Sequence, residues 1–217
     1  MLIADLHVHS NHSSDGVDSV KALIAAALEK GLNCISITDH NTVNGSLEAM
    51  EYVEEEHIPI TVIPGVEIST SDGHMLAYGI TRDVDRGMEM KETAILVRKL
   101  GGISAIAHPF RFHKHGIVAF WKVISVVDAI EVFNAKFYMG VCNTLSSIIA
   151  KRYDKPAIAG SDAHCKEMVG YGITEIYASN SHSALHAIKD GRVKVRGRRI
   201  PISIQLQNSL RKLRSTL

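Results

Sequence analysis

The sequence contains few cysteines and no long apolar run. Cys34, Cys142 and Cys165 are the only cysteines among 217 residues, and an odd count this small argues against a disulfide framework and fits a reducing compartment. No apolar run reaches the roughly 18 residues that span a bilayer. The opening MLIADLHVHS has no basic region before its apolar stretch, so we expect no signal peptide. These absences predict a cytoplasmic protein without a membrane segment.

Low-complexity stretches and Pro/Ser-rich linkers are also missing, so nothing in the sequence marks a domain boundary. With 46% hydrophobic and 22% charged residues, the composition is that of a globular protein with a sizeable core and excludes a disordered or coiled-coil chain. We therefore expect residues 1–217 to form a single domain.

The charge is unevenly distributed although the net charge is only +1. Residues 192–217 carry eight Lys or Arg and no acid, which leaves 16 basic against 23 acidic side chains in residues 1–191, a balance of −7. A basic segment on an acidic body is typical of a protein with an anionic partner. A solvated carboxy-terminal segment is the alternative explanation.

Short β-branched runs alternate with longer stretches of helical periodicity. Strands are predicted over residues 2–7, 34–38, 60–63, 75–80, 103–107, 129–133, 156–159 and 174–178. Helices are predicted over residues 19–30, 45–56, 88–100, 117–126, 139–153 and 182–189, with a further one over 203–213. This alternation predicts an α/β fold with parallel strands connected by right-handed crossovers.

Polar side chains lie at the ends of most of the predicted strands. In an open sheet the ligand crevice receives groups from only a few strand ends, whereas in a barrel every strand end surrounds one mouth. Contributions from so many strands therefore favour a barrel.

The clearest of these polar groups are histidines and carboxylates. His7 and His9 are two apart in an extended segment, so both imidazoles point to one face and can reach one ion. Asp15 follows in a loop of small residues, where His12 is the rival candidate. Asp39 and His40 end the 34–38 strand, although an Asp there is also a common turn former.

Further along the chain, Glu67 stands in an apolar stretch, where it is either an exposed edge residue or a buried carboxylate that needs a partner or a metal. His74 opens a strand, and His108 ends one before Pro109. Asp162 and His164 repeat the two-residue spacing. The candidate ligands number nine: His7, His9, Asp15, His40, Glu67, His74, His108, Asp162 and His164. Nine groups exceed the needs of one ion and predict two or three divalent ions, with a donor set that suits Zn, Mn or Fe.

Taken together, DLHVHS, a loop ending in SDG, ITDHN, PGVEIS, a following GH, AHP and GSDAH resemble the PHP domain family (polymerase and histidinol phosphatase), and the resemblance runs from Asp5 to about His164. It implies a distorted (β/α)7 TIM-like barrel with three ions at the carboxyl ends of the strands. His7, His9, Glu67 and Asp162 would hold one ion. Glu67 would bridge to a second ion with His74 and His108, while Asp15, His40 and His164 would hold the third.

The resemblance also implies a function, which we expect to be metal-dependent hydrolysis of a phosphate ester by activated water, with Glu67, Asp162 and His164 as catalytic residues. Arg111, Asn134 and Lys136 are the candidates for substrate binding, because phosphate needs cationic and hydrogen-bonding partners. Asp5 and Asp39 are expected to orient the histidines. The substrate would be a small phosphomonoester, a nucleotide or a short oligonucleotide, the last favoured by the basic segment.

Two other functions fit parts of the sequence. A non-catalytic metal-binding PHP module could support a nucleic-acid enzyme, although a degenerate module would be expected to have lost ligands. A metal-dependent amide or ring hydrolase on a similar barrel is disfavoured, because such a site would place a lysine carrier or a histidine pair where Glu67 stands.

Overall fold

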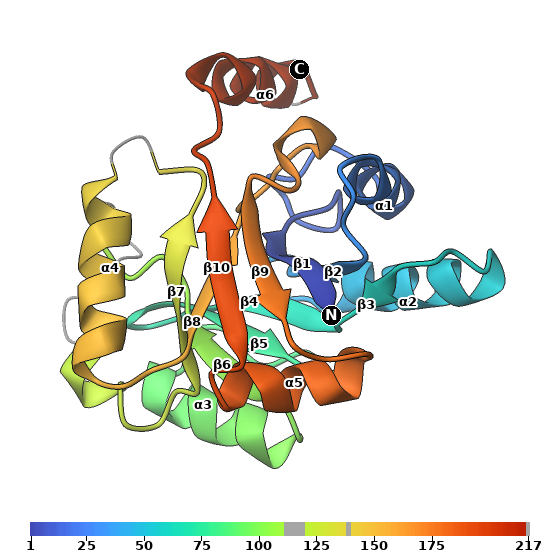
Figure 1. The fold of residues 1–217 in the computed structure, drawn as a ribbon. Helices are drawn as coiled ribbons and strands as arrows, with labels where there is room; N and C mark the ends of the chain where they lie inside the picture. The colour runs from blue at the N-terminus through green and yellow to red at the C-terminus, as the bar shows by residue number, and fades with distance from the viewer. Residues whose placement is uncertain (111–119, 138–139, 216–217) are drawn as a thin grey trace.

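The computed structural model describes residues 1–110, 120–137 and 140–215. Within these residues the chain forms two five-stranded sheets and six α-helices (Figure 1). The strands are β1 (Leu2–Val8), β2 (Cys34–Ile37), β3 (Thr61–Val62), β4 (Gly65–Thr70), β5 (Gly73–Tyr78), β6 (Ile103–Ile106), β7 (Ala129–Asn134), β8 (Ala157–Gly160), β9 (Gly172–Ile176) and β10 (Val193–Gly197). The helices are α1 (Val20–Glu29), α2 (Asn44–Glu55), α3 (Met90–Lys99), α4 (Val141–Arg152), α5 (Ser181–Lys189) and α6 (Ile202–Ser215).

The sheets combine parallel and antiparallel pairs. One has the order β10-β9-β1-β2-β3 and the other β4-β5-β6-β7-β8. Strand β9 is antiparallel to β1 and β10, and β5 is antiparallel to β4 and β6. Only two residues separate β4 from β5, which is enough for a hairpin and too few for a crossover helix. The expected α/β class is confirmed, but the described residues do not close into the expected barrel.

Two isolated bridges join the sheets at the end where the candidate ligands lie. Isolated parallel bridges connect His40 with Glu67 and Val8 with Ala163. At the first bridge the amide of Glu67 donates to the Asp39 carbonyl at 3.1 Å, and at the second the amide of His9 donates to the Ala163 carbonyl at 2.8 Å. Strands of both sheets therefore deliver side chains to the same end of the molecule.

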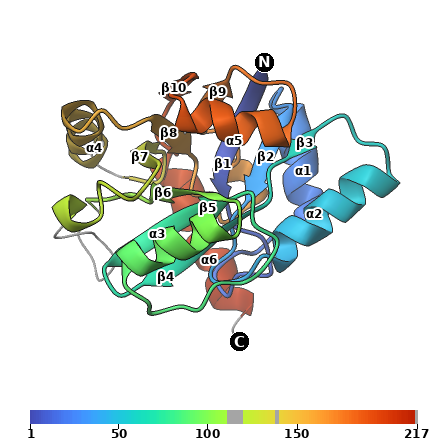
Figure 2. The same cartoon turned by 90° about the horizontal axis from the view of Figure 1, so that it is seen from below.

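Apolar helix faces cover the sheets, as the periodicity predicts. In α1 the side chains of Val20, Leu23 and Ile24 are buried, and the Ser19 hydroxyl caps the helix by accepting from the Ala22 amide. Figure 2 shows α3 lying along β4 to β6, with α1 and α2 beside β2 and β3. No helix in the described part of the chain is long and apolar enough to cross a membrane.

Some elements differ from the expectation. Strands β4 and β10 were not predicted, because the PGVEIST and RVKVRG runs are short and interrupted by glycine or charge. Of the helix expected over 117–126, residues 117–119 lie outside the described part, and the remainder holds a single 3-10 turn at Phe120–Lys122. The helix expected over 203–213 is confirmed as α6.

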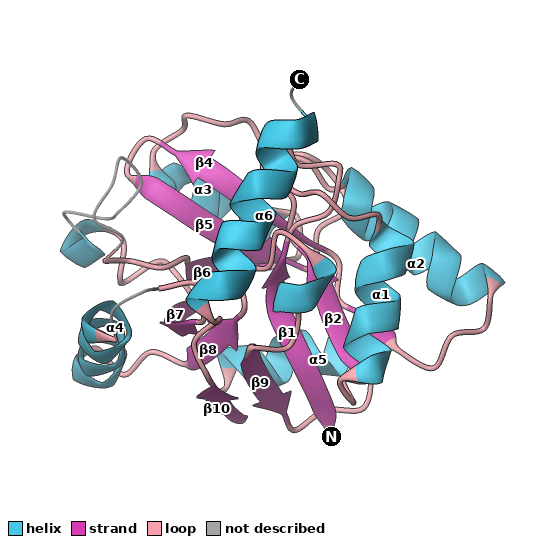
Figure 3. Ribbon diagram, turned by 90° about the horizontal axis from the view of Figure 1, so that it is seen from above, coloured by secondary structure: helices cyan, strands magenta, loops and turns pink. Residues whose placement is uncertain are grey.

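The basic segment 192–217 is not a solvated tail over its described residues. Strand β10 extends a sheet, where Arg196 pairs with Glu175 at 2.7 Å and Lys194 lies over the Tyr177 ring. Helix α6 crosses above the ends of the strands, as the view from above shows (Figure 3). The basic side chains before α6 therefore belong to a folded segment at a sheet edge, where they are exposed.

Two glycines let β8 and β9 approach closely although they belong to different sheets. A Cβ on Gly172 would overlap the Gly160 carbonyl, and one on Gly160 would overlap Cβ of His7. Backbone cannot move aside as a flexible side chain can, so these positions require glycine. The contact also sets the distance from β8 to the strand that carries His7 and His9.

We expect Gly172→Ala to lower the free energy of unfolding by about 1–3 kcal/mol through overpacking, as measured by urea denaturation. Gly140→Ala is the matched control, because Gly140 has an ordinary φ of −70° and a Cβ there would contact nothing within 4 Å. That variant should be neutral or stabilised by up to about 1 kcal/mol. Equal stability of the two variants would contradict the close-contact role of Gly172.

Candidate metal centre

Glu67 is the centre of a cluster of imidazoles. It lies within β4 with 1% of its surface exposed. Its Oε1 atom lies 2.8 Å from Nδ1 of His74 and 2.8 Å from Nε2 of His108. Three imidazole nitrogens surround Oε2: Nε2 of His7 at 3.3 Å, Nε2 of His9 at 3.2 Å and Nδ1 of His40 at 3.2 Å. The alternative of an exposed edge residue is therefore wrong.

Strand geometry explains why these side chains meet. His7 in β1 and His9 just beyond it share one face of an extended segment. His74 lies in antiparallel β5 opposite Ser69, and its carbonyl accepts from the Ala107 amide at 3.1 Å. Because β5 runs antiparallel to β6, the start of β5 lies beside the end of β6. His74 therefore lies near His108, which follows β6.

Asp162 forms a second group with two of the same histidines. Its Oδ1 atom lies 3.6 Å from Nε2 of His9, 3.9 Å from Nε2 of His7 and 3.3 Å from Nδ1 of His164. The backbone of Asp162 has φ of 53°, and that of His108 has φ of 27°. A positive φ is uncommon for residues other than glycine, although Asp and His adopt it more often than most, and such residues cluster at functional sites.

Asp15 lies in a third group at the rim. Its Oδ2 atom is 2.7 Å from Nε2 of His164 and 3.6 Å from Nε2 of His40. His12, the rival from the same loop, instead pairs with Glu48 on the surface at 2.6 Å. Of the two, the structure brings Asp15 to the cluster.

All nine expected ligands come together in overlapping groups whose ligand atoms lie within 4.8 Å of one another. The groups are His9, Asp15, His40 and His164; His7, His9 and Asp162; His7, Glu67 and His108; and His40, Glu67 and His74. The sharing of His7, His9, His40 and Glu67 makes this one continuous centre.

The donor atoms fit divalent ions. Among the described residues, the buried Nε2 atoms of His7 and His9 have no hydrogen-bond partner, which is costly unless another group binds them. Nδ1 of His7 donates to Oε1 of Glu131 at 2.9 Å, so a neutral His7 carries its lone pair on Nε2, facing the cluster. Mixed imidazole and carboxylate donors suit Zn, Mn or Fe.

Glu131 is a site residue that the sequence reasoning missed. It is buried in β7, and its Oε2 atom also accepts from the His108 amide at 2.7 Å. Its carboxylate therefore orients both the ring of His7 and the backbone at His108. A charged residue inside the apolar run AIEVF was the available signal.

Asp5 and Asp39, expected to orient the histidines, accept from backbone and hydroxyl groups, and for Asp5 these include the His7 amide at 3.3 Å. Asp5 accepts from the amides of Ser161 at 2.9 Å and Gly170 at 2.7 Å. Asp39 accepts from the amide of Ser10 at 2.6 Å and from its hydroxyl at 2.7 Å. Both carboxylates position loops that carry ligands, because unpaired loop amides need acceptors.

Charge coupling shifts the pKa values of the cluster strongly. Although burial opposes it, the imidazoles of His7 and His40 hold the pKa of Glu67 well below its usual range. Burial alone would lower the pKa of His7, but Glu131, Glu67 and Asp162 raise it well above its usual value. Burial and the ammonium of Lys136 lower the pKa of His164 to about 3. His164 is therefore neutral, as a metal ligand must be.

The expected substrate-binding residues lie in different surroundings. The Lys136 ammonium is 3.2 Å from Oδ1 of Asp162 and 3.0 Å from Nδ1 of His164. It therefore contacts two of the expected metal ligands directly. Asn134 is buried, and its side-chain amide donates to Asp162 and Glu131, each at 3.2 Å, so it supports both carboxylates. Arg111 lies outside the described residues.

Comparison with known proteins places these residues in a family. The PHP domain family matches residues 5–111, and the PHP-associated family matches residues 142–193. An uncharacterised protein of Methanocaldococcus jannaschii, MJ1587, is 27% identical over 66% of this chain and 88% of its own length. The 5'-3' exoribonuclease Rnm of Escherichia coli is 39% identical, but the match covers only 32% of this chain and 23% of that protein.

The fold is shared with a solved two-domain protein from Bacteroides vulgatus that contains a predicted PHP-like metal-dependent phosphoesterase. The TM-score is 0.76 at 20% identity, and the match covers 91% of this chain and 65% of the other. With its PHP and PHP-associated segments in order, a shared fold and a buried His/carboxylate cluster, this chain belongs to the PHP domain family.

Proposed function

We propose that this protein is a metal-dependent phosphoesterase that hydrolyses a nucleotide or another small phosphomonoester. The observation that carries the proposal is the buried cluster around Glu67, where nine ligand-type side chains converge and the Nε2 atoms of His7 and His9 have no hydrogen-bond partner among the described residues. A protein does not bury so many titratable groups without compensation. Bound cations would provide it.

Two or three divalent ions fit the proposal, with Zn, Mn or Fe as the candidates. We assign His7, His9, Glu67 and Asp162 to the first ion. Glu67 would bridge to the second with His74 and His108, and Asp15, His40 and His164 would hold the third. Nδ1 of His40 lies 3.2 Å from Oε2 of Glu67, and the ligand atoms of Asp15 and His9 lie within 4.8 Å of each other. These distances support close spacing of the three proposed ions.

When bound, divalent ions supply positive charge that lowers the pKa of water and offsets charge on phosphoryl oxygens. The chain's own part is to hold and orient. Glu131 keeps the proton of His7 on Nδ1, and Asn134 fixes Asp162. Glu67, Asp162 and His164 would lie nearest the reacting phosphoryl group, and Lys136 would contact its oxygens, with Arg111 as a second cation.

The substrate class is supported by similarity. The match with an exoribonuclease covers a minor part of either chain, so it favours a nucleotide or short oligonucleotide without defining one. Residues from both matched segments, such as His108 and Asp162, meet in one centre, which supports a single functional domain. The free cysteines Cys34, Cys142 and Cys165 are buried, in agreement with a cytoplasmic protein.

Phosphate release should be observed when the full chain, loaded with Mn or Zn, is given a panel of phosphomonoesters and nucleotides. Removal of the ions with a chelator should abolish it, and returning them should restore it. A protein that takes up ions but releases phosphate from no member of the panel would instead be the non-catalytic metal-binding module.

Glu67→Gln should lose at least one ion per chain and about 100-fold or more in activity, because an amide nitrogen cannot bridge two cations. Elemental analysis of the ion-loaded wild type should give two or three ions per chain. Glu48→Gln is the matched control, since Glu48 only pairs with His12 at the surface, and it should keep both ions and activity. A folded Glu67→Gln protein with full metal content and normal turnover would rule out the bridging role.

Metal affinity should rise as the pH increases from the ordinary imidazole pKa of about 6.5 to higher values. His7 and His40 have raised pKa values, so both are more protonated near neutral pH than free histidine, whereas binding requires neutral rings. Uptake should therefore release protons. Calorimetry of Zn uptake in buffers of different ionisation enthalpy measures this, and heats that do not depend on the buffer would contradict it.

A further inference from the structure

Helix α6 lies across the ends of the strands (Figures 1 and 3). Gln205 and Asn208 are buried. The outward side exposes four apolar side chains, each 57–64% accessible: Ile202, Leu206, Leu210 and Leu213. An amphipathic helix usually buries its apolar side, but Ile204 alone among the described apolar side chains of α6 packs against the core, and only in part.

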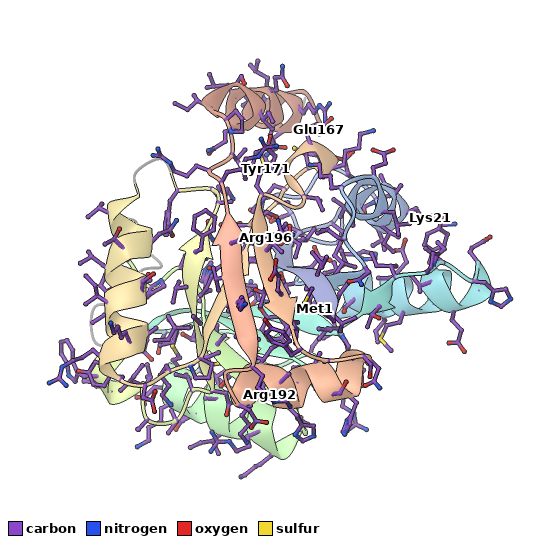
Figure 4. The ribbon with its side chains drawn as sticks, viewed as in Figure 1. Met1, Lys21, Glu167, Tyr171, Arg192 and Arg196 are labelled. Atoms are coloured by element: carbon purple, nitrogen blue, oxygen red, sulfur yellow. The ribbon has the colours of Figure 1, made fainter. Side chains whose placement is uncertain are left out.

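Polar contacts hold the helix in this orientation. Both terminal nitrogens of Arg211 donate to the Glu167 carboxylate, at 3.0 and 2.9 Å, and Glu167 lies just below α6 in Figure 4. Near the start of the helix, the side-chain amide of Gln205 donates to the Ile200 carbonyl at 3.2 Å. A bidentate Arg–carboxylate pair is geometrically specific, and it brings the next residue, Lys212, over the rim of the centre.

Lys212 contacts Asp15 and Lys136 contacts His164, two ligand residues that pair with each other. The Lys212 ammonium is 4.0 Å from Oδ2 of Asp15, and that oxygen is 2.7 Å from Nε2 of His164. The Lys136 ammonium contacts His164 from the β7–α4 connection, 3.1 Å from Nε2. Lys212 is partly buried, and the charges of Asp15, Lys136 and Asp162 all act on its pKa, which burial lowers. Two cations from distant parts of the chain therefore flank one edge of the centre.

We propose that Lys212 and Lys136 form a phosphate subsite at the Asp15 edge of the centre, with a dianionic phosphoryl group as its ligand. This inference rests on the proposed function. Divalent ions on Asp15 and Asp162 would compensate the carboxylates that now attract the two lysines, so the ammonium groups would turn to an incoming anion. Lysine suits this role because its compact charge and rotatable donors adapt to phosphate oxygens. Residues 193–198 direct their basic side chains elsewhere, as Lys194 and Arg198 over tyrosine rings show.

The test is binding of inorganic phosphate to the ion-loaded full chain, measured by calorimetry. Lys212→Met removes the charge and keeps most of the stem, and it should raise the Kd for phosphate about tenfold, as expected for a lost charged hydrogen bond. Lys212→Arg should restore affinity to within about threefold. Lys194→Met, which removes the same charge from β10, should bind as the wild type does. With an active phosphoester, Lys212→Met should raise KM and change kcat less than about twofold.

Metal content and thermal stability of each variant are measured in parallel, so that a loss of ions or of folding is recognised. Equal phosphate affinity for Lys212→Met and Lys194→Met would overturn the subsite, as would a wild type that takes up ions but binds no phosphate. A protein that binds phosphate through Lys212 yet hydrolyses no ester of the panel contradicts the proposed function and supports the subsite alone.

Discussion

The buried carboxylate of Glu67 is the group on which the rest of the structure depends. An unpaired charge at 1% exposure would be very costly, and here five imidazole nitrogens lie within 3.3 Å of its two oxygens. Those imidazoles come from both sheets, so the sheets must meet where Glu67 lies. The isolated backbone bridge between His40 and Glu67 joins the sheets at this point.

Close packing between β8 and β9 is a second contact that holds the two sheets together. Gly160 and Gly172 allow β8 and β9 to touch, and Gly160 also packs against His7. Asp5 and Asp39 hold the loop amides next to the ligands, and Glu131 orients His7 through its ring. The ligands are thus positioned by a layer of hydrogen bonds in which backbone amides take a larger part than side chains do, which is a rigid support for a metal site.

The carboxy-terminal segment adds an unusual cover. Its strand completes a sheet edge, whereas its helix buries Gln205 and Asn208 and exposes leucines to solvent. The Arg211–Glu167 pair and partial packing of Ile204 attach the helix to the rest of the chain. A cover of this kind adds charge to the rim of the site and leaves the ligand groups themselves unchanged.

The sequence by itself determined which residue types would meet and, through strand periodicity, at which end of the strands. His7 and His9 were predictable because a two-residue spacing in extended chain is a local property, whereas Asp162 has a left-handed backbone beyond β8 and meets His164 by a different geometry. Their assembly around Glu67 was predictable only as a count of ligands. The hairpin between β4 and β5, the role of Glu131 and the seat of Lys212 were decided by tertiary structure. Each depends on pairing between segments far apart in the chain, such as Lys212 with Asp15, and a local pattern carries no information about such long-range contacts.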